Sequence, residues 1–243
     1  ASLDLSGGTI GGTGALVVSG ASTWSSGSMT GTGSTTTNGG LTLSGTAAKD
    51  LNAGRTLNTT GTTTWVNSGF NDAGRIRTGS GVTINNTGAW LDQNPLNTRI
   101  SNDLGGPAST FVNAGSYTKS GAGTTDIQIG FNNSSSGVGT GVVTVNAATL
   151  ALSGGGTSNG SFDVATGNTL NFAGGTHALN AVLSGTGTGR MLVSGGTVNT
   201  SGANNFGGQL VVSGGSFNVG LSFDAASLDL SGGTIGGTGA LVV

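Results

Sequence analysis

The sequence predicts an all-β fold in which short parallel strands stack into a solenoid. Three observations lead to this prediction. Residues 1–18 recur letter for letter at 226–243, so the shift of 226 minus 1 indicates a tandem unit of 225 residues. Within the unit, Gly-Gly motifs recur about every 20 residues. Apolar residues alternate with other residues just before each motif. Repeats of this length that contact only their neighbours are typical of solenoids.

The strands are predicted from five segments that each end at a glycine pair: TLALSGG, TLNFAGG, RMLVSGG, QLVVSGG and SLDLSGG. The residues two and four places before the first glycine are apolar in every segment. An alternation with one constant apolar face predicts a strand with one buried side. Asn171 and Asp229 fall on the other side and are expected to face solvent. The predicted core ladder consists of Leu170, Phe172, Met191, Val193, Leu210, Val212, Leu228 and Leu230.

The glycine pairs are predicted to form the corners, because glycine readily adopts the positive φ that a sharp corner between strands requires. The N-terminal half repeats the theme less regularly in STWSSG, TTWVNSG and STFVNAG. No helical periodicity is present. Residues 1–225 are therefore expected to form one unit of about 11 coils, and residues 226–243 the first coil of the next unit.

Composition excludes several classes of protein. Glycine supplies 51 of 243 residues without a Gly-X-Y period, which excludes collagen, and 34% hydrophobic residues favour a packed core over disorder. The charged fraction of 7% and the net charge of −2 give no basic surface, so nucleic acid is not an expected partner. The absence of cysteine excludes disulfides and thiolate metal sites. No apolar run is long enough for a membrane span in this segment.

Three segments carry a resemblance to a known group of proteins. SYTKSGAGTTDIQIG at 116–130, VTVNAATLALSGGG at 143–156 and LNFAGGTHALN at 170–180 resemble the β-strand repeats of autotransporter passengers and filamentous-haemagglutinin-like bacterial surface proteins. The resemblance implies a right-handed parallel β-helix that is secreted, extracellular or at the cell surface, with an adhesive or structural role. Residues 46–56 and 91–107 depart from the repeat pattern.

The residues that catalysis and metal binding require are scarce. Nine aspartates are scattered along the chain, glutamate is absent, and His177 is the single histidine. General acid–base chemistry needs clustered groups of this kind, so neither an enzyme nor a cofactor is expected. His177 lacks a second histidine or cysteine for a metal site, and we expect it at a corner with its hydrogen bonds satisfied. Calcium is not expected either, because Ala15 follows GGTG where calcium-binding repeats need aspartate.

Two further features each allow two interpretations. Trp24, Trp65 and Trp90 either pack in the core, which we favour, or stack on sugars at the surface. The segment 91–107 contains both prolines and breaks the coil pattern, so it is either a tolerated insertion or a loop that projects from the rod and recurs once per unit. The candidate contact residues of such a loop are Asp92, Pro95, Arg99 and Asp103.

These observations lead to an expected function and two alternatives. We expect a non-catalytic structural segment of a giant repetitive bacterial fibre or adhesin stalk, stiff because its units continue end to end. The first alternative is an adhesin module that binds surface glycans or neighbouring filaments through 91–107, which includes lateral self-association. The second is a polysaccharide-active enzyme on a β-helix.

Overall fold

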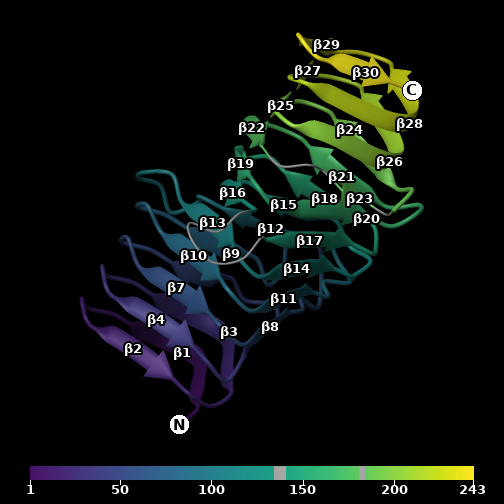
Figure 1. The fold of residues 1–243 in the computed structure, drawn as a ribbon. Coiled ribbons are helices and arrows are strands. Elements are labelled where there is room, and N and C mark those ends of the chain that lie inside the picture. The colour runs from purple at the N-terminus through teal and green to yellow at the C-terminus, as the bar shows by residue number, and fades with distance from the viewer. Residues whose placement is uncertain (134–140, 181–183, 186) are drawn as a thin grey trace.

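The chain forms a rod of stacked strands with its two termini at opposite ends (Figure 1). This computed structural model describes residues 1–133, 141–180, 184–185 and 187–243. The described residues form thirty strands and no helix, which confirms the predicted all-β parallel solenoid. No helix suited to crossing a bilayer occurs within these ranges.

Each turn of the solenoid passes in order through three faces, which we name face 1, face 2 and face 3. Within each sheet, strands pair in parallel with the strand one turn earlier and one turn later. Faces 1 and 2 belong to one sheet of 19 strands, whereas face 3 is divided between β16 (Gly130–Asn132) and β19 (Gly156–Ser158) into sheets of 6 and 5 strands. An isolated parallel bridge from Asn133 to Ser158 links these two sheets. Four long strands, β1 (Leu3–Ile10), β3 (Ser22–Met29), β26 (Ala203–Val212) and β28 (Ser222–Leu230), run from face 1 into face 2. Within the described residues, face 1 therefore has twelve strands and the solenoid makes about eleven turns.

The remaining strands of each face follow in chain order. Face 1 contains β5 (Leu41–Leu43), β8 (Thr62–Trp65), β11 (Ala89–Asp92), β14 (Ser116–Lys119), β17 (Val142–Val145), β20 (Ser161–Val164), β23 (Ser184–Gly185) and β30 (Ala240–Val242). Face 2 contains β6 (Lys49–Leu51), β9 (Ile76–Thr78), β12 (Thr98–Ser101), β15 (Thr125–Ile127), β18 (Thr149–Leu152), β21 (Thr169–Phe172) and β24 (Arg190–Val193). Face 3 contains β2 (Ala15–Val18), β4 (Ser34–Thr37), β7 (Thr56–Thr59), β10 (Thr83–Asn86), β13 (Thr110–Asn113), β16 (Gly130–Asn132), β19 (Gly156–Ser158), β22 (Thr176–Leu179), β25 (Thr197–Thr200), β27 (Ser216–Val219) and β29 (Thr234–Gly237).

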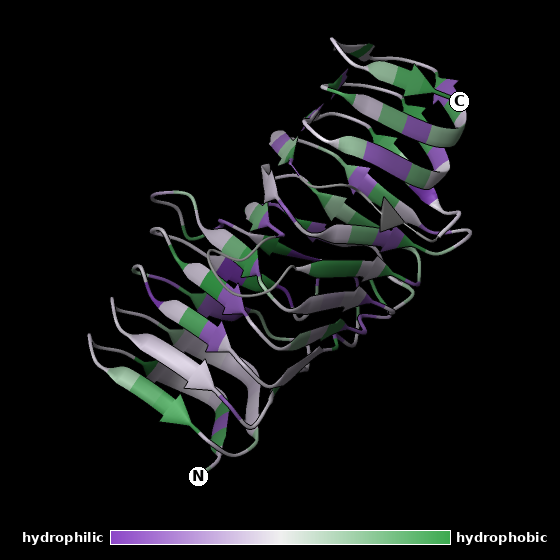
Figure 2. Cartoon of the chain, viewed as in Figure 1, coloured by the Kyte–Doolittle hydropathy of each residue, from purple (hydrophilic) through white to green (hydrophobic). Residues whose placement is uncertain are grey.

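The core lies inside the three faces, and hydrophobic and hydrophilic residues alternate along many of the strands (Figure 2). Six of the eight predicted ladder residues are completely buried: Leu170, Phe172, Met191, Val193, Leu210 and Val212. Asp229 is exposed and Asn171 is partly exposed, as the alternation predicts. Trp24, Trp65 and Trp90 are completely buried, so they belong to the core and do not form a surface for sugars.

The other two predicted ladder residues are not buried as expected. Leu228 is partly buried and Leu230 is 54% exposed. Both belong to the last level of face 2 in this chain, where they pair with Leu210 and Val212 on one side. In a solenoid, the turns on both sides cover an apolar residue. A strand that is paired on one side only therefore leaves part of its apolar side chains exposed.

The irregular segments are explained by a change in turn length. Turns near the ends advance by 18 or 19 residues, whereas the central turns advance by 27. Residues 91–107 fall within these longer central turns and contribute β12 to face 2. Residues 46–56 contribute β6 and lie in the preceding turn, which advances by 22 residues. The extra residues lie between strands, so the parallel pairing is preserved while the sequence period is lost.

Close stacking of the backbone explains the glycines at the corner between face 3 and face 1. Gly61, Gly88 and Gly115 lie above one another, and a Cβ added to Gly115 would lie 2.0 Å from the carbonyl oxygen of Gly88. Any larger residue would push the turns apart. At the Gly-Gly corners, positive φ values occur at Gly175 and Gly215, both 68°, as the predicted corners require.

The two identical segments occupy different faces. Leu3 to Leu5 pair with β3 on face 1, whereas their copies Leu228 to Leu230 pair with β26 on face 2. Ala15 lies on face 3 and its copy Ala240 on face 1. In this sequence, short strand segments begin six residues apart, at 3, 9 and 15. Because the spacing is equal, each segment can occupy the next face of the solenoid in the second copy. A unit of 225 residues thus corresponds to ten turns and one further face.

Candidate functional site

The predicted contact segment 91–107 does not project from the rod. Its beginning belongs to β11 and its middle forms β12, both paired with strands of adjacent turns. Asp92 is completely buried, whereas Pro95 and Asp103 are exposed and Arg99 is partly exposed. Of the two interpretations of this segment, the projecting loop is therefore wrong, because the additional residues widen the turn. The segment contributes to two separate polar sites, one outside and one inside the solenoid.

The outer site is a cluster of charges on face 2. The Asp72 carboxylate lies 2.5 Å from Arg75 Nη1 and 3.1 Å from Arg99 Nη2. Asp103 lies 3.6 Å from Arg75 Nε and 3.8 Å from Arg99 Nη2. Each arginine thus faces two carboxylates, and all four side chains are about one-third exposed. Exposed pairs of this kind add little to stability, but together they fix the direction of the side chains.

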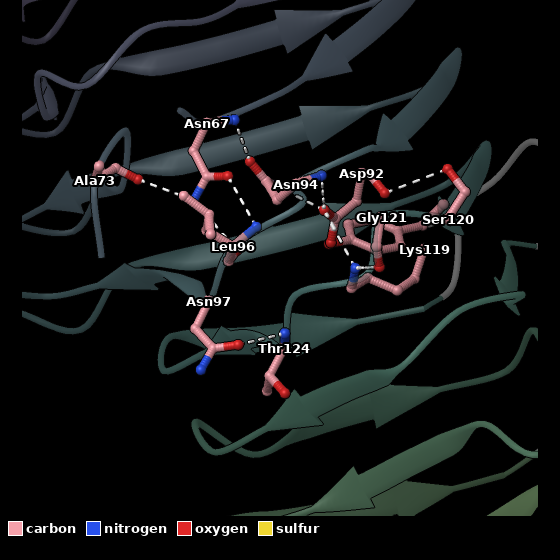
Figure 3. Close-up of polar contacts among 11 residues, drawn as sticks. Asn67, Ala73, Asp92, Asn94, Leu96, Asn97, Lys119, Ser120, Gly121 and Thr124 are labelled. Atoms are coloured by element: carbon pink, nitrogen blue, oxygen red, sulfur yellow. Dashed lines mark hydrogen bonds and ion pairs between the residues drawn. The ribbon is translucent and has the colours of Figure 1, made fainter. Parts of the chain in front are cut away.

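A surface cavity of about 250 Å³ adjoins this cluster. The residues that line it are of polar or charged type: Asn71, Asp72, Asn97, Thr98, Arg99, Thr124, Asp126 and Gln128. Asn71 Oδ1 accepts a hydrogen bond from the backbone N–H of Asn97 at 3.1 Å. Asn97 Oδ1 accepts one from the backbone N–H of Thr124 at 2.8 Å (Figure 3). These bonds hold the side-chain oxygens against the backbone. The cavity therefore offers amide, guanidinium and carboxylate groups that can bond the hydroxyls of a polar ligand.

The inner site interrupts the apolar ladder of face 1. Trp65, Asp92, Lys119 and Val145 occupy successive positions of one column, and all four are completely buried. Two charged groups thus stand where an aliphatic residue is expected. Removing a charge from water is costly unless the charge is paired and hydrogen-bonded, so the neighbours of this pair are significant.

Hydrogen bonds surround the Asp92 carboxylate (Figure 3). Tyr117 donates its hydroxyl proton to Oδ2 at 2.9 Å, and Asn94 donates from Nδ2 to Oδ1 at 2.7 Å. Lys119 Nζ lies 3.9 Å from Oδ1 and donates to the carbonyl oxygen of Gly121. Burial lowers the pKa of Lys119, and the charge of Asp92 opposes this change. Burial also raises the pKa of Tyr117, an effect that Asp92 strengthens.

A second buried polar column runs along face 3. Thr59 donates to Asn86 Oδ1 at 3.1 Å, Asn86 donates to Asn113 at 2.8 Å, and Asn113 donates to Asn133 at 2.9 Å. The second protons of the three amides bond to backbone carbonyls of β14, β17 and β20. Every step of this ladder connects two adjacent turns, so its role is structural.

Two more buried cations bond to carbonyl or hydroxyl oxygens. Lys49 Nζ donates to the carbonyl oxygens of Ser44 at 2.5 Å and Ala47 at 2.9 Å, and burial lowers its pKa to about 8. Arg55 bonds Thr35 Oγ1 at 2.9 Å and the Thr30 carbonyl at 3.0 Å. Both residues close a corner of the solenoid by bonding groups that would otherwise be buried without partners.

His177 is buried beneath a corner. Its Nε2 lies 2.9 Å from the carbonyl oxygen of Gly174, and its ring meets Phe172 edge-on at 4.8 Å. Burial lowers its pKa, against the effect of hydrogen bonds to Gly174 and Leu152. Its hydrogen bond to the corner is as expected, although the side chain is inside the core. No group of three potential metal ligands occurs in the part of the chain that the structure describes.

No protein-family model, curated protein or solved structure matches this chain. The sequence did not identify four residues that contribute polar groups to the two sites: Lys119, Asn94, Asn97 and Asp126. The signal that connects them is the 27-residue spacing of the central turns, which places Asp92 beside Lys119 and Arg99 beside Asp126.

Proposed function

We propose that this chain is a structural segment of a repetitive extracellular fibre or adhesin stalk of bacterial origin. The observation that carries the proposal is the stack of about eleven turns, in which the sheet of faces 1 and 2 continues along the rod and the terminal segments share one sequence. Strands that pair with both neighbouring turns resist bending and let length grow by repetition. The interior ladders of Asn86, Asn113 and Asn133 add side-chain bonds in the same direction.

An antibody raised against the 243-residue chain tests the location. We expect it to label intact cells of the producing organism as strongly as permeabilised cells, and to lose its signal when the gene is deleted. Labelling that requires permeabilisation contradicts an extracellular fibre. Negative-stain images of the shed protein should show unbranched rods, because solenoid units add length along one axis.

We propose that the segment is not catalytic. Asp72 faces two arginines, and Asp126 accepts hydrogen bonds from Gln128 Nε2 at 2.8 Å and Ser153 Oγ at 2.6 Å. Carboxylates held in this way are poorly placed to exchange protons with a substrate. Incubation with acidic polysaccharides should release no oligosaccharides, and turnover that a single aspartate variant abolishes would contradict the proposal.

The outer cavity supports a second candidate, which is weak binding of a glycan. Its polar lining around Arg99 and Asp126 suits hydroxyl groups, and one such site per unit would give multivalent attachment along a fibre. On a glycan array, Arg99→Ala and Asp126→Ala should reduce binding at least tenfold, whereas the exposed Asp229→Ala should leave it unchanged. Equal binding by all three variants would exclude this cavity.

A further inference from the structure

We propose that the side chains of Lys119 and Asn94 become joined by an intramolecular amide bond that links two turns of the solenoid. An amine, a primary amide and a carboxyl group lie together at the inner site (Figure 3). All three residues are completely buried. These are the components needed to exchange one amide for another. The inference stands on this site alone and does not depend on the proposed function.

The geometry orients the amide for attack. The backbone N–H of Asn67 donates to Asn94 Oδ1 at 2.7 Å, which identifies the oxygen and polarises the carbonyl. The nitrogen of the same amide donates to Asp92 Oδ1 at 2.7 Å. Because Tyr117 holds the other carboxylate oxygen at 2.9 Å, Asp92 cannot rotate freely. The carbonyl carbon thus lies between an N–H that can stabilise an oxyanion and a carboxyl group beside the leaving nitrogen.

The amine is held next to this amide. Lys119 Nζ lies 3.9 Å from the carboxylate oxygen that Asn94 also contacts. It donates to the carbonyl of Gly121, and a Cβ on Gly121 would come within 2.2 Å of the Asn94 backbone oxygen, so the two residues are in direct contact. The proposed reaction requires a rotation about the lysine side chain that carries Nζ from the Gly121 carbonyl to Asn94 Cγ.

The reaction balances without an oxidant or a co-reactant. Lys119 transfers a proton to Asp92, which leaves a neutral amine and a carboxylic acid. The Nζ lone pair attacks Asn94 Cγ, and the carbonyl electron pair moves onto Oδ1, where the Asn67 N–H stabilises it. The bond from Cγ to Nδ2 then breaks, Nδ2 takes the proton from Asp92 and leaves as ammonia, and Nζ returns one proton to Asp92. The products are a secondary amide, ammonia and a neutral Asp92.

Burial favours each of these steps. Desolvation lowers the pKa of Lys119, so the nucleophilic neutral amine becomes accessible. The fold holds the reacting groups side by side, which replaces the entropy cost of a bimolecular encounter. A direct bond between Lys119 and Asp92 is the less suitable alternative, because it would consume the carboxyl group that moves the protons and would release water instead of ammonia.

Mass spectrometry of the folded 243-residue chain tests the proposal. We expect the intact mass to be lower than the sequence mass by about 17 Da, the mass of ammonia. Trypsin should then yield residues 78–99 joined to 100–190 as one branched peptide, since cleavage after Lys119 is blocked. Lys49 is the matched control in the same digest: it is equally buried but donates to the Ser44 and Ala47 carbonyls, so cleavage after it should be complete.

The peptide map separates the bond from other reactions. A succinimide at an asparagine also expels ammonia but leaves Lys119 cleavable, so that result overturns the proposal, as does an unchanged mass. A loss of about 18 Da with a link to Asp92 overturns it too. Asp92→Asn should restore the full mass and cleavage after Lys119. If Asp92→Asn retains the branched peptide, the assigned role of Asp92 is wrong. If this variant does not fold, the peptide map of the unaltered chain still shows whether the bond between Lys119 and Asn94 is present.

Discussion

Leu170→Ala is a direct test of the interior ladder. Leu170 is completely buried on β21 and pairs with Leu150 on one side and Met191 on the other. The substitution removes three carbons, which corresponds to about 2.4 kcal/mol at about 0.8 kcal/mol for each buried methylene. The turns on both sides fix the space, so the cavity cannot close fully and should bring the cost to about 3 kcal/mol.

Asn171→Ala is the matched control, because it alters the adjacent residue on the opposite side of the same strand. Asn171 is partly exposed and its Oδ1 accepts a hydrogen bond from Ser194 at 2.8 Å on the exterior. We expect a loss of about 0.5 kcal/mol or less. Urea unfolding followed by circular dichroism measures both variants. If Leu170→Ala is no more destabilising than Asn171→Ala, the assignment of inside and outside on face 2 is wrong.

Two further predictions concern a buried charge and a glycine corner. Because burial lowers the pKa of Lys49 from 10.5 to about 8, the unfolded chain binds more protons between these values, and the free energy of unfolding should rise with pH by up to about 3 kcal/mol. The raised pKa of Tyr117 opposes this rise above about pH 10, so urea unfolding should be measured between pH 8 and 10. If Lys49→Met leaves the slope of the unfolding free energy against pH unchanged, Lys49 is not its source. Gly115→Ala should cost about 2 kcal/mol or more, whereas Gly7→Ala, with nothing within 4 Å of its added Cβ, should be nearly neutral; equal urea midpoints would argue against the close stacking.

The sequence predicted the fold best where the turn length is nearly constant. The ladder from Leu170 to Val212 follows from alternation and glycine corners, since both signals recur at almost the same spacing. The central turns were harder to recognise because 27-residue turns insert variable segments between strands. Parallel pairing depends on the position of the strands and not on equal loop lengths, so a search for one short period cannot detect it.

The candidate sites were harder to predict than the fold. Asp92 was expected on a projecting loop because a charged residue beside prolines usually lies outside the core. Its burial becomes reasonable only once Tyr117, Asn94 and Lys119 are placed around it, and these contacts depend on the register between turns. The glycines at 61, 88 and 115 carry the same 27-residue spacing and are the sequence signal for that register.

The most direct test of the account is the relation between consecutive units in a chain that contains two or more of them. Because residues 1–18 begin on face 1 and their copies at 226–243 begin on face 2, each unit should advance by ten turns and one face. At about 4.8 Å per turn, cryo-electron microscopy should show a continuous rod with a rise of about 50 Å per unit and a rotation of about one-third of a turn. Separate globular units, or consecutive units that present the same sequence on the same face, would contradict the continuous solenoid.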